Sequence, residues 1–259
     1  MTKLPVWSTT APGVTAVHEL GYEQIRWGYG DPPKIAPRSH FGPGYATKVE
    51  PMPAYGHDVD QVCALLERCH QEAPLCVPVS VNVLKLVDGR GSNGWAQQRW
   101  CYDDDSRFAD DEAPAQRKYR NWDGVIVLSG KTTEIHPAIA RYVVPHEYAH
   151  VLEDALGLIR YGDLSEHRSS EALMREWAEV RGVDDRFFDL EYSVTNHHLQ
   201  PCEVFANDFR RLIGAEREWW PHDDVVPALG VLDTSPAGLW WDEAIDQLRE
   251  CSKQAKAAA

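Results

Sequence analysis

The sequence predicts an α+β fold, with short strands in the first half of the chain and a mainly helical C-terminal half. Short apolar stretches that alternate with polar residues, or stand between glycines, occupy the first half of the chain. From about residue 137 onward, the apolar positions recur with helical spacing instead. The chain has 259 residues, of which 43% are hydrophobic, so it is long enough to bury a sizeable core.

Three segments are predicted to be strands. Residues 77–87 alternate valines at 79, 81 and 83 with polar or outward positions, which is the period of a half-buried strand. A glycine-rich turn over residues 89–94 then leads into a return strand over 95–102. Residues 124–130 form an apolar run between two glycines, which indicates a buried strand.

Helices are expected over residues 57–71, 137–156, 169–182 and 237–251, and in a stretch that begins at 203. Gly157 is predicted to cap the second of these helices. Pro145 lies inside the same helix and removes one of its hydrogen bonds. Either the helix is kinked just before His146, or a second helix begins at Pro145.

The chain is expected to contain three segments. Residues 1–56 are rich in proline and glycine, which argues against a long helix or a central strand and predicts an irregular N-terminal extension. Residues 57–251 form the main domain, and residues 252–259 are a short tail. The extension is expected to pack on the domain or to wrap a partner.

Composition excludes several classes of function. The net charge of −14 repels phosphate groups, so neither a nucleic acid nor an anionic membrane is an expected partner. No apolar run approaches the ~20 residues of a membrane span, and the N-terminal stretch does not have the pattern of a signal peptide. A cytoplasmic location with reduced cysteines is expected, although delivery by a dedicated secretion machine would also need no such signal.

The stretch His146-Glu147-Tyr148-Ala149-His150 carries the main chemical signal. Two histidines four residues apart lie on one helical face and can direct two ring nitrogens at one zinc ion. Glu147 lies about 100° further round the helix, within reach of a zinc-bound water. We therefore predict a zinc site with His146 and His150 as ligands and Glu147 as general base and then acid.

A third ligand is needed, and the residues leave several candidates. A histidine six positions after His150 would indicate a metzincin, but that position is Leu156. Glu203 is favoured because Asn207 follows one turn later, where it can orient a histidine ligand, and because aromatic residues flank it. The other candidates are His167, Glu171, Glu176, Glu179, His197 and His198.

His-Glu-x-x-His followed by Glu203-Val204-Phe205-Ala206-Asn207-Asp208-Phe209-Arg210 resembles the gluzincin metallopeptidases. More narrowly, it is similar to the catalytic domain of anthrax lethal factor and to Pro-Pro endopeptidases, over about residues 120–215. The resemblance implies a zincin-like α+β fold, in which a small mixed sheet lies over the helix of His146. It also implies that residues 57–251 are the catalytic domain and that Glu203 is the third zinc ligand. It also implies that an upstream tyrosine stabilises the oxyanion, and Tyr192 in Tyr-Ser-Val-Thr-Asn matches it. The spacer from Tyr192 to Glu203 is longer here, which leaves His197 and His198 as alternatives.

The expected function is that of a zinc-dependent endopeptidase acting on a peptide or protein substrate. A second hypothesis is a structural or interaction component of a larger assembly, which keeps the zincin fold with little or no turnover. A third is a domain that binds no metal at all. The intact Glu147 argues against the second hypothesis, because a purely structural zinc site needs no general base.

Overall fold

The computed structural model describes residues 6–7, 14–20, 57–75, 79–85, 94–102, 119–130, 136–161, 166–190, 196–214, 220–230 and 234–258. The chain divides into two compact units. The first contains Met1–Glu67 and Val77–Val144, and the second contains Arg68–Cys76 and Pro145–Ala259. The predicted division at residues 56 and 251 stays a prediction.

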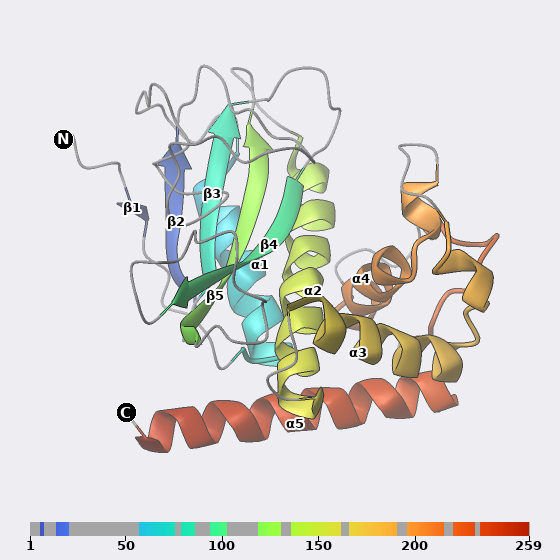
Figure 1. Ribbon diagram of the computed structural model, residues 1–259. Coiled ribbons are helices and arrows are strands. Elements are labelled where there is room, and N and C mark those ends of the chain that lie inside the picture. The colour runs from blue at the N-terminus through green and yellow to red at the C-terminus, as the bar shows by residue number, and fades with distance from the viewer. Residues whose placement is uncertain are drawn as a thin grey trace, which may run out of the picture. The chain divides into compact units, whose positions relative to one another are not determined.

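The first unit contains a five-stranded sheet, in which neighbouring strands have the order β1-β2-β3-β5-β4 (Figure 1). They are β1 (Val6–Trp7), β2 (Val14–Leu20), β3 (Val79–Lys85), β4 (Gly94–Tyr102) and β5 (Tyr119–Gly130). Strands β2, β3 and β5 pair in parallel, and β1 and β4 add antiparallel edges. β1 and β2 lie within the segment predicted to be irregular. The structure gives residues 14–20, which precede the proline-rich stretch, as a strand. The extension as a separate segment stays a prediction.

The predicted α+β class with a small mixed sheet must be corrected. The part of the chain to which a fold class can be assigned is mostly helical, at 73%, and the five strands described above lie outside it. The class that fits this part is therefore mainly helical.

Two helices are longer than predicted at their C-terminal ends. α2 (Pro137–Tyr161) continues past Gly157, and α5 (Pro236–Ala258) continues past residue 251. One glycine costs a helix only about 1 kcal/mol, which packing can offset.

The remaining helices lie close to their predicted positions. α1 spans Val59–Glu72, α3 spans Glu166–Arg181 and α4 spans Pro201–Leu212, with short 3₁₀ turns η3 (Asp185–Phe187) and η4 (His197–Leu199) between them. α2 is one helix with Pro145 inside it, so no second helix begins there. Gly182 ends α3 with a positive φ of 78°, and the N–H of Val183 reaches the carbonyl of Ala178 over 2.9 Å.

Helices α3, α4 and α5 contribute the aromatic core of the second unit. Phe205 of α4 lies 5.5 Å from the ring of Trp177 on α3 and 4.6 Å from that of Trp241 on α5. All three side chains are buried. Figure 1 shows α5 as one long helix that passes along α3, and the two helices are in contact. This core fixes the direction in which α4 presents its first turn.

A buried ion pair connects α3, α4 and the loop that follows α4. Arg181, at the end of α3, lies 2.7 Å from a carboxylate oxygen of Asp208, which is fully buried on α4. The same guanidinium also donates to the backbone carbonyl of Pro227. One arginine thus ties residues 220–230 to α4. Among the helices that the structure describes, none is both long and apolar enough to cross a membrane.

Candidate metal centre

Helix α2 presents the two histidines of the motif on one face. Their ring centroids lie 5.0 Å apart with nearly perpendicular planes, as a spacing of one helical turn allows. Tyr148 is buried on another face, and its hydroxyl donates a 2.9 Å hydrogen bond to the carbonyl of Ala73. This bond fixes the rotation of the helix, so His146 and His150 keep a common direction.

Helix α4 supplies the carboxylate. Pro201 stands in its first turn, where the missing N–H leaves no helical bond unmade. Glu203 follows in the same turn, where the helix dipole stabilises a negative charge. Phe205 and Phe209 contact the ring of Trp241 at centroid distances of 4.6 and 5.9 Å. The buried aromatic side of α4 therefore holds Glu203 in place.

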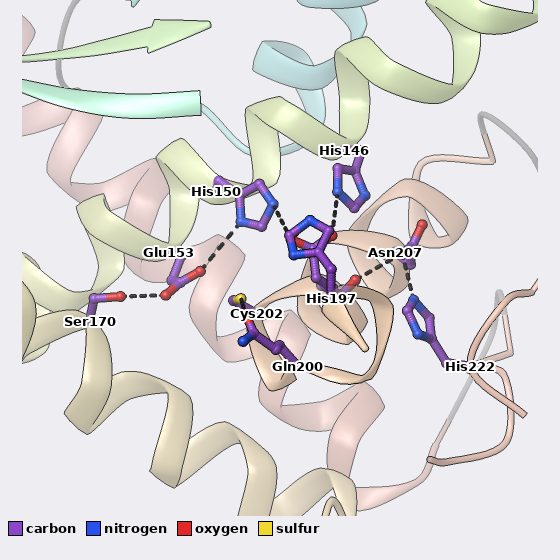
Figure 2. Close-up of polar contacts among 10 residues, drawn as sticks. His146, His150, Glu153, Ser170, His197, Gln200, Cys202, Asn207 and His222 are labelled. Atoms are coloured by element: carbon purple, nitrogen blue, oxygen red, sulfur yellow. Dashed lines mark hydrogen bonds and ion pairs between the residues drawn. The ribbon is translucent and has the colours of Figure 1, made fainter. Parts of the chain in front are cut away.

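The two helices bring His146, His150 and Glu203 together. Nε2 of His146 lies 3.0 Å from Oε2 of Glu203, and Nε2 of His150 lies 3.5 Å from Oε1. One donor atom from each residue lies within 4.8 Å of the other two. Figure 2 shows both imidazoles extending from α2 toward the same point. The structure thus brings together the three residues predicted to bind the metal; their binding of a metal stays a prediction.

The carboxylate and the imidazoles of this cluster shift the pKa values of one another. Burial acts to raise the pKa of Glu203, but the imidazoles of His146, His150 and His197 outweigh it and hold that pKa well below its usual value. Burial likewise acts to lower the pKa of His150, and the carboxylates of Glu153 and Glu203 outweigh it in the opposite direction. The carboxylate is therefore ionised, which is the state that binds a metal cation, whereas His150 has to release its proton before it can bind one.

Glu147 is buried beside this cluster and belongs to the same helical turn as His146. Burial raises the pKa of its carboxyl group, while the nearby imidazoles of His146 and His150 oppose the rise. A carboxylate with a raised pKa is a better proton acceptor near neutral pH. This placement suits the predicted role of Glu147 as general base, which remains untested.

The prediction from sequence missed Glu153. Its Oε2 lies 3.6 Å from Nδ1 of His150, and its Oε1 accepts a hydrogen bond from the hydroxyl of Ser170 on α3. A carboxylate on the outer nitrogen of a ligand histidine fixes the tautomer and the ring direction. The signal was present in the sequence, because Glu153 follows His150 by three residues on the same helix.

His222 was missed as well, and it lies in the loop after α4. The amide nitrogen of Asn207 donates to the carbonyl of Glu203 over 2.9 Å and lies 2.6 Å from Nε2 of His222. Burial lowers the pKa of His222 to about 4, so the ring is neutral at pH 7 and accepts this bond. Asn207 therefore supports the backbone at Glu203. We predicted that it orients a ligand histidine, but its amide nitrogen contacts the carbonyl of Glu203 and the ring of His222 instead. No short-range pattern marks His222.

The alternatives for the oxyanion donor are only partly described. Tyr192 lies outside the described residues. Nε2 of His197 lies 3.0 Å from Oε1 of Glu203, whereas His198 is exposed and stacks against His222 at a centroid distance of 6.4 Å. Of the two histidines, His197 is therefore the one that contacts the carboxylate of the metal cluster.

The other candidate ligands are engaged elsewhere or not described. Glu171 forms an exposed ion pair with Arg175 one turn later. Glu176 accepts hydrogen bonds from Arg160, Tyr161 and Trp240, and Glu179 is exposed. The side chain of His167 lies outside the described residues. In the part of the chain that is described, the group that can hold a metal is therefore His146, His150 and Glu203.

The donor set fits zinc. Two imidazole nitrogens and one carboxylate oxygen match the three-ligand catalytic sites of this metal, which leave a fourth position open. Neighbouring ligands on a tetrahedral zinc stand about 3.3 Å apart when the bonds are ~2.0–2.1 Å long. The contacts of 3.0 and 3.5 Å, which reach the two different oxygens of Glu203, are close to that spacing, and one donor atom from each residue lies within 4.8 Å of the other two.

Comparison with known protein families, with curated proteins and with solved structures finds no match to this chain. The resemblance to gluzincins therefore rests on the short motifs alone.

Proposed function

We propose that this protein is a zinc-dependent endopeptidase. The observation that supports this best is the cluster of His146, His150 and Glu203, whose donor atoms lie within 4.8 Å of one another beside the buried Glu147. A zinc site that served structure alone would need neither an open fourth position nor an adjacent carboxylate base. The likeness of the motifs to gluzincins supports the same reaction.

Each residue has a defined task in this reaction. His146, His150 and Glu203 would hold zinc, which would supply a bound water of pKa ~7 and polarise the substrate carbonyl. Glu147 takes the proton from the water and then passes it to the leaving amine. Tyr192 donates a hydrogen bond to the carbonyl oxygen as its negative charge grows. Peptides or proteins are the substrates, and the cytoplasm is the proposed location.

The decisive experiment compares the wild type with Glu147→Gln. Metal content of the purified proteins is measured by mass spectrometry, and turnover is measured on a peptide library. We expect both proteins to hold about one zinc per chain and the variant to lose turnover by ~10²-fold or more, because only the proton acceptor is removed.

Other outcomes decide against parts of the proposal. A variant that loses its zinc would show that Glu147 is a ligand. A wild type that holds zinc but cleaves no peptide would favour the structural or interaction component. A wild type without zinc would remove the metal centre from the proposal altogether.

A further inference from the structure

His197 and Glu203 are connected by a short, well-bonded segment. Gln200 separates the 3₁₀ turn η4 from α4, and its N–H donates to the carbonyl of His197 over 3.1 Å. The carbonyl of Gln200 in turn accepts from the N–H groups of Glu203 and Val204, at 3.0 and 3.2 Å. The backbone of His197 is therefore fixed relative to the first turn of α4.

The side chain of His197 comes from η4 and contacts the carboxylate of Glu203. Its Nε2 lies 3.0 Å from Oε1 of Glu203, while Oε2 of the same carboxylate lies 3.0 Å from Nε2 of His146. Oε1 also lies 3.5 Å from Nε2 of His150, so each oxygen faces one histidine of α2, and Oε1 faces His197 of η4 as well. Figure 2 shows the ring of His197 facing the cluster between His146 and His150.

A carboxylate that binds a metal through one oxygen must have its rotation fixed by contacts to the other. Ligand carboxylates are commonly hydrogen-bonded for this reason, and loss of such a partner costs 10- to 100-fold in metal affinity. His197 supplies that contact at Oε1. Its side chain is 43% exposed, and it does not belong to the compact group of donors formed by the other three residues.

We propose that His197 is the positioning residue for the ligand carboxylate: it holds Oε1 of Glu203 so that Oε2 is directed at the metal. This inference rests on the proposed function, because it assumes that Glu203 binds zinc. It assigns His197 a task in forming the metal site and does not make it the oxyanion donor.

The test measures the affinity of the full chain for Zn²⁺ by competition with a chromophoric chelator. The variants are His197→Ala, the conservative His197→Gln, and Glu171→Ala as control. Glu171 forms an exposed ion pair with Arg175 one turn later on α3. We expect His197→Ala to lose 10- to 100-fold in affinity. His197→Gln should recover part of the loss, because its amide can donate to Oε1, and Glu171→Ala should stay within about threefold.

Thermal unfolding of the metal-free variants and Co²⁺ absorption spectra complete the test. A loss of Zn²⁺ affinity that His197→Gln does not reduce, together with a lowered melting temperature, would make the role of His197 merely structural and overturn the proposal. A changed Co²⁺ coordination number would make His197 a ligand, and unchanged affinity in His197→Ala would leave it with no role in the metal site. Each of these results overturns the inference while the proposed function stands. A wild type that binds no Zn²⁺ would overturn both.

Discussion

The two halves of the candidate metal cluster are built in different ways. On α2, His146, Glu147 and His150 lie within five consecutive residues, and the helix repeat alone sets their spacing. On α4, the direction of Glu203 depends on His197, on Asn207 and, through Asn207, on His222. The first half is a local motif, whereas the second is an assembly of residues from separate elements. The comparison implies that the α4 half is more easily disturbed from a distance.

Removal of Glu203 should have the largest effect. Glu203→Ala leaves two imidazoles, and catalytic zinc sites take three protein ligands. We expect zinc affinity to fall by more than the ~100-fold that loss of an outer partner costs, as measured by chelator competition. Glu171→Ala is the matched control, because that glutamate lies in an exposed ion pair on α3. Equal affinities in the two variants would mean that α4 contributes no ligand.

Tyr192→Phe should lower turnover next most strongly. A hydroxyl that strengthens its bond to the developing negative charge should cost ~10- to 10³-fold in kcat when it is removed, with a smaller change in KM. Steady-state kinetics at saturating zinc measures both constants. If Tyr192→Phe leaves kcat unchanged and His197→Ala or His198→Ala lowers it instead, the oxyanion donor is a histidine of η4.

The remote support of Glu203 should appear as a pH dependence of stability. Burial lowers the pKa of His222 from 6.5 to about 4, so between these values the unfolded chain binds the proton and the folded chain does not. The free energy of unfolding should therefore fall as pH decreases from about 6.5 to 4, by up to about 3 kcal/mol, and be unaffected by this group above pH 6.5. Urea unfolding of chelator-treated wild type and His222→Gln measures it. Parallel curves for the two proteins would contradict the assigned pKa.

Glu153→Gln should have the smallest effect and tests the α2 half. Glutamine keeps the shape of the side chain but lacks the charge that faces Nδ1 of His150. We expect a 10- to 100-fold loss of zinc affinity, toward the lower end of this range because the contact is 3.6 Å long. A loss as large as that of Glu203→Ala would show that the α2 half also depends strongly on support beyond its motif.

The same contrast explains what the sequence could predict. The spacing of His146 and His150, and the aromatic residues around Glu203, are local patterns, and the structure brings these three side chains together. The contacts of His222 with Asn207 and of His197 with Oε1 of Glu203 depend on how loops return to the cluster, which no local pattern encodes. Gly157 misled the prediction of the end of α2, because packing outweighed its weak propensity to stop a helix.

The ion pair between Arg181 and Asp208 limits which substitutions the chain can accept at these two positions. Asp208 is fully buried next to Asn207, and Arg181 also holds the carbonyl of Pro227 in the loop of His222. A single change at either position would leave a charge buried without its partner, at a cost of about 3–5 kcal/mol. In descendants of this chain, positions 181 and 208 should therefore change together or not at all. Their joint replacement by apolar residues would also release Pro227, which frees the loop of His222 to vary in turn.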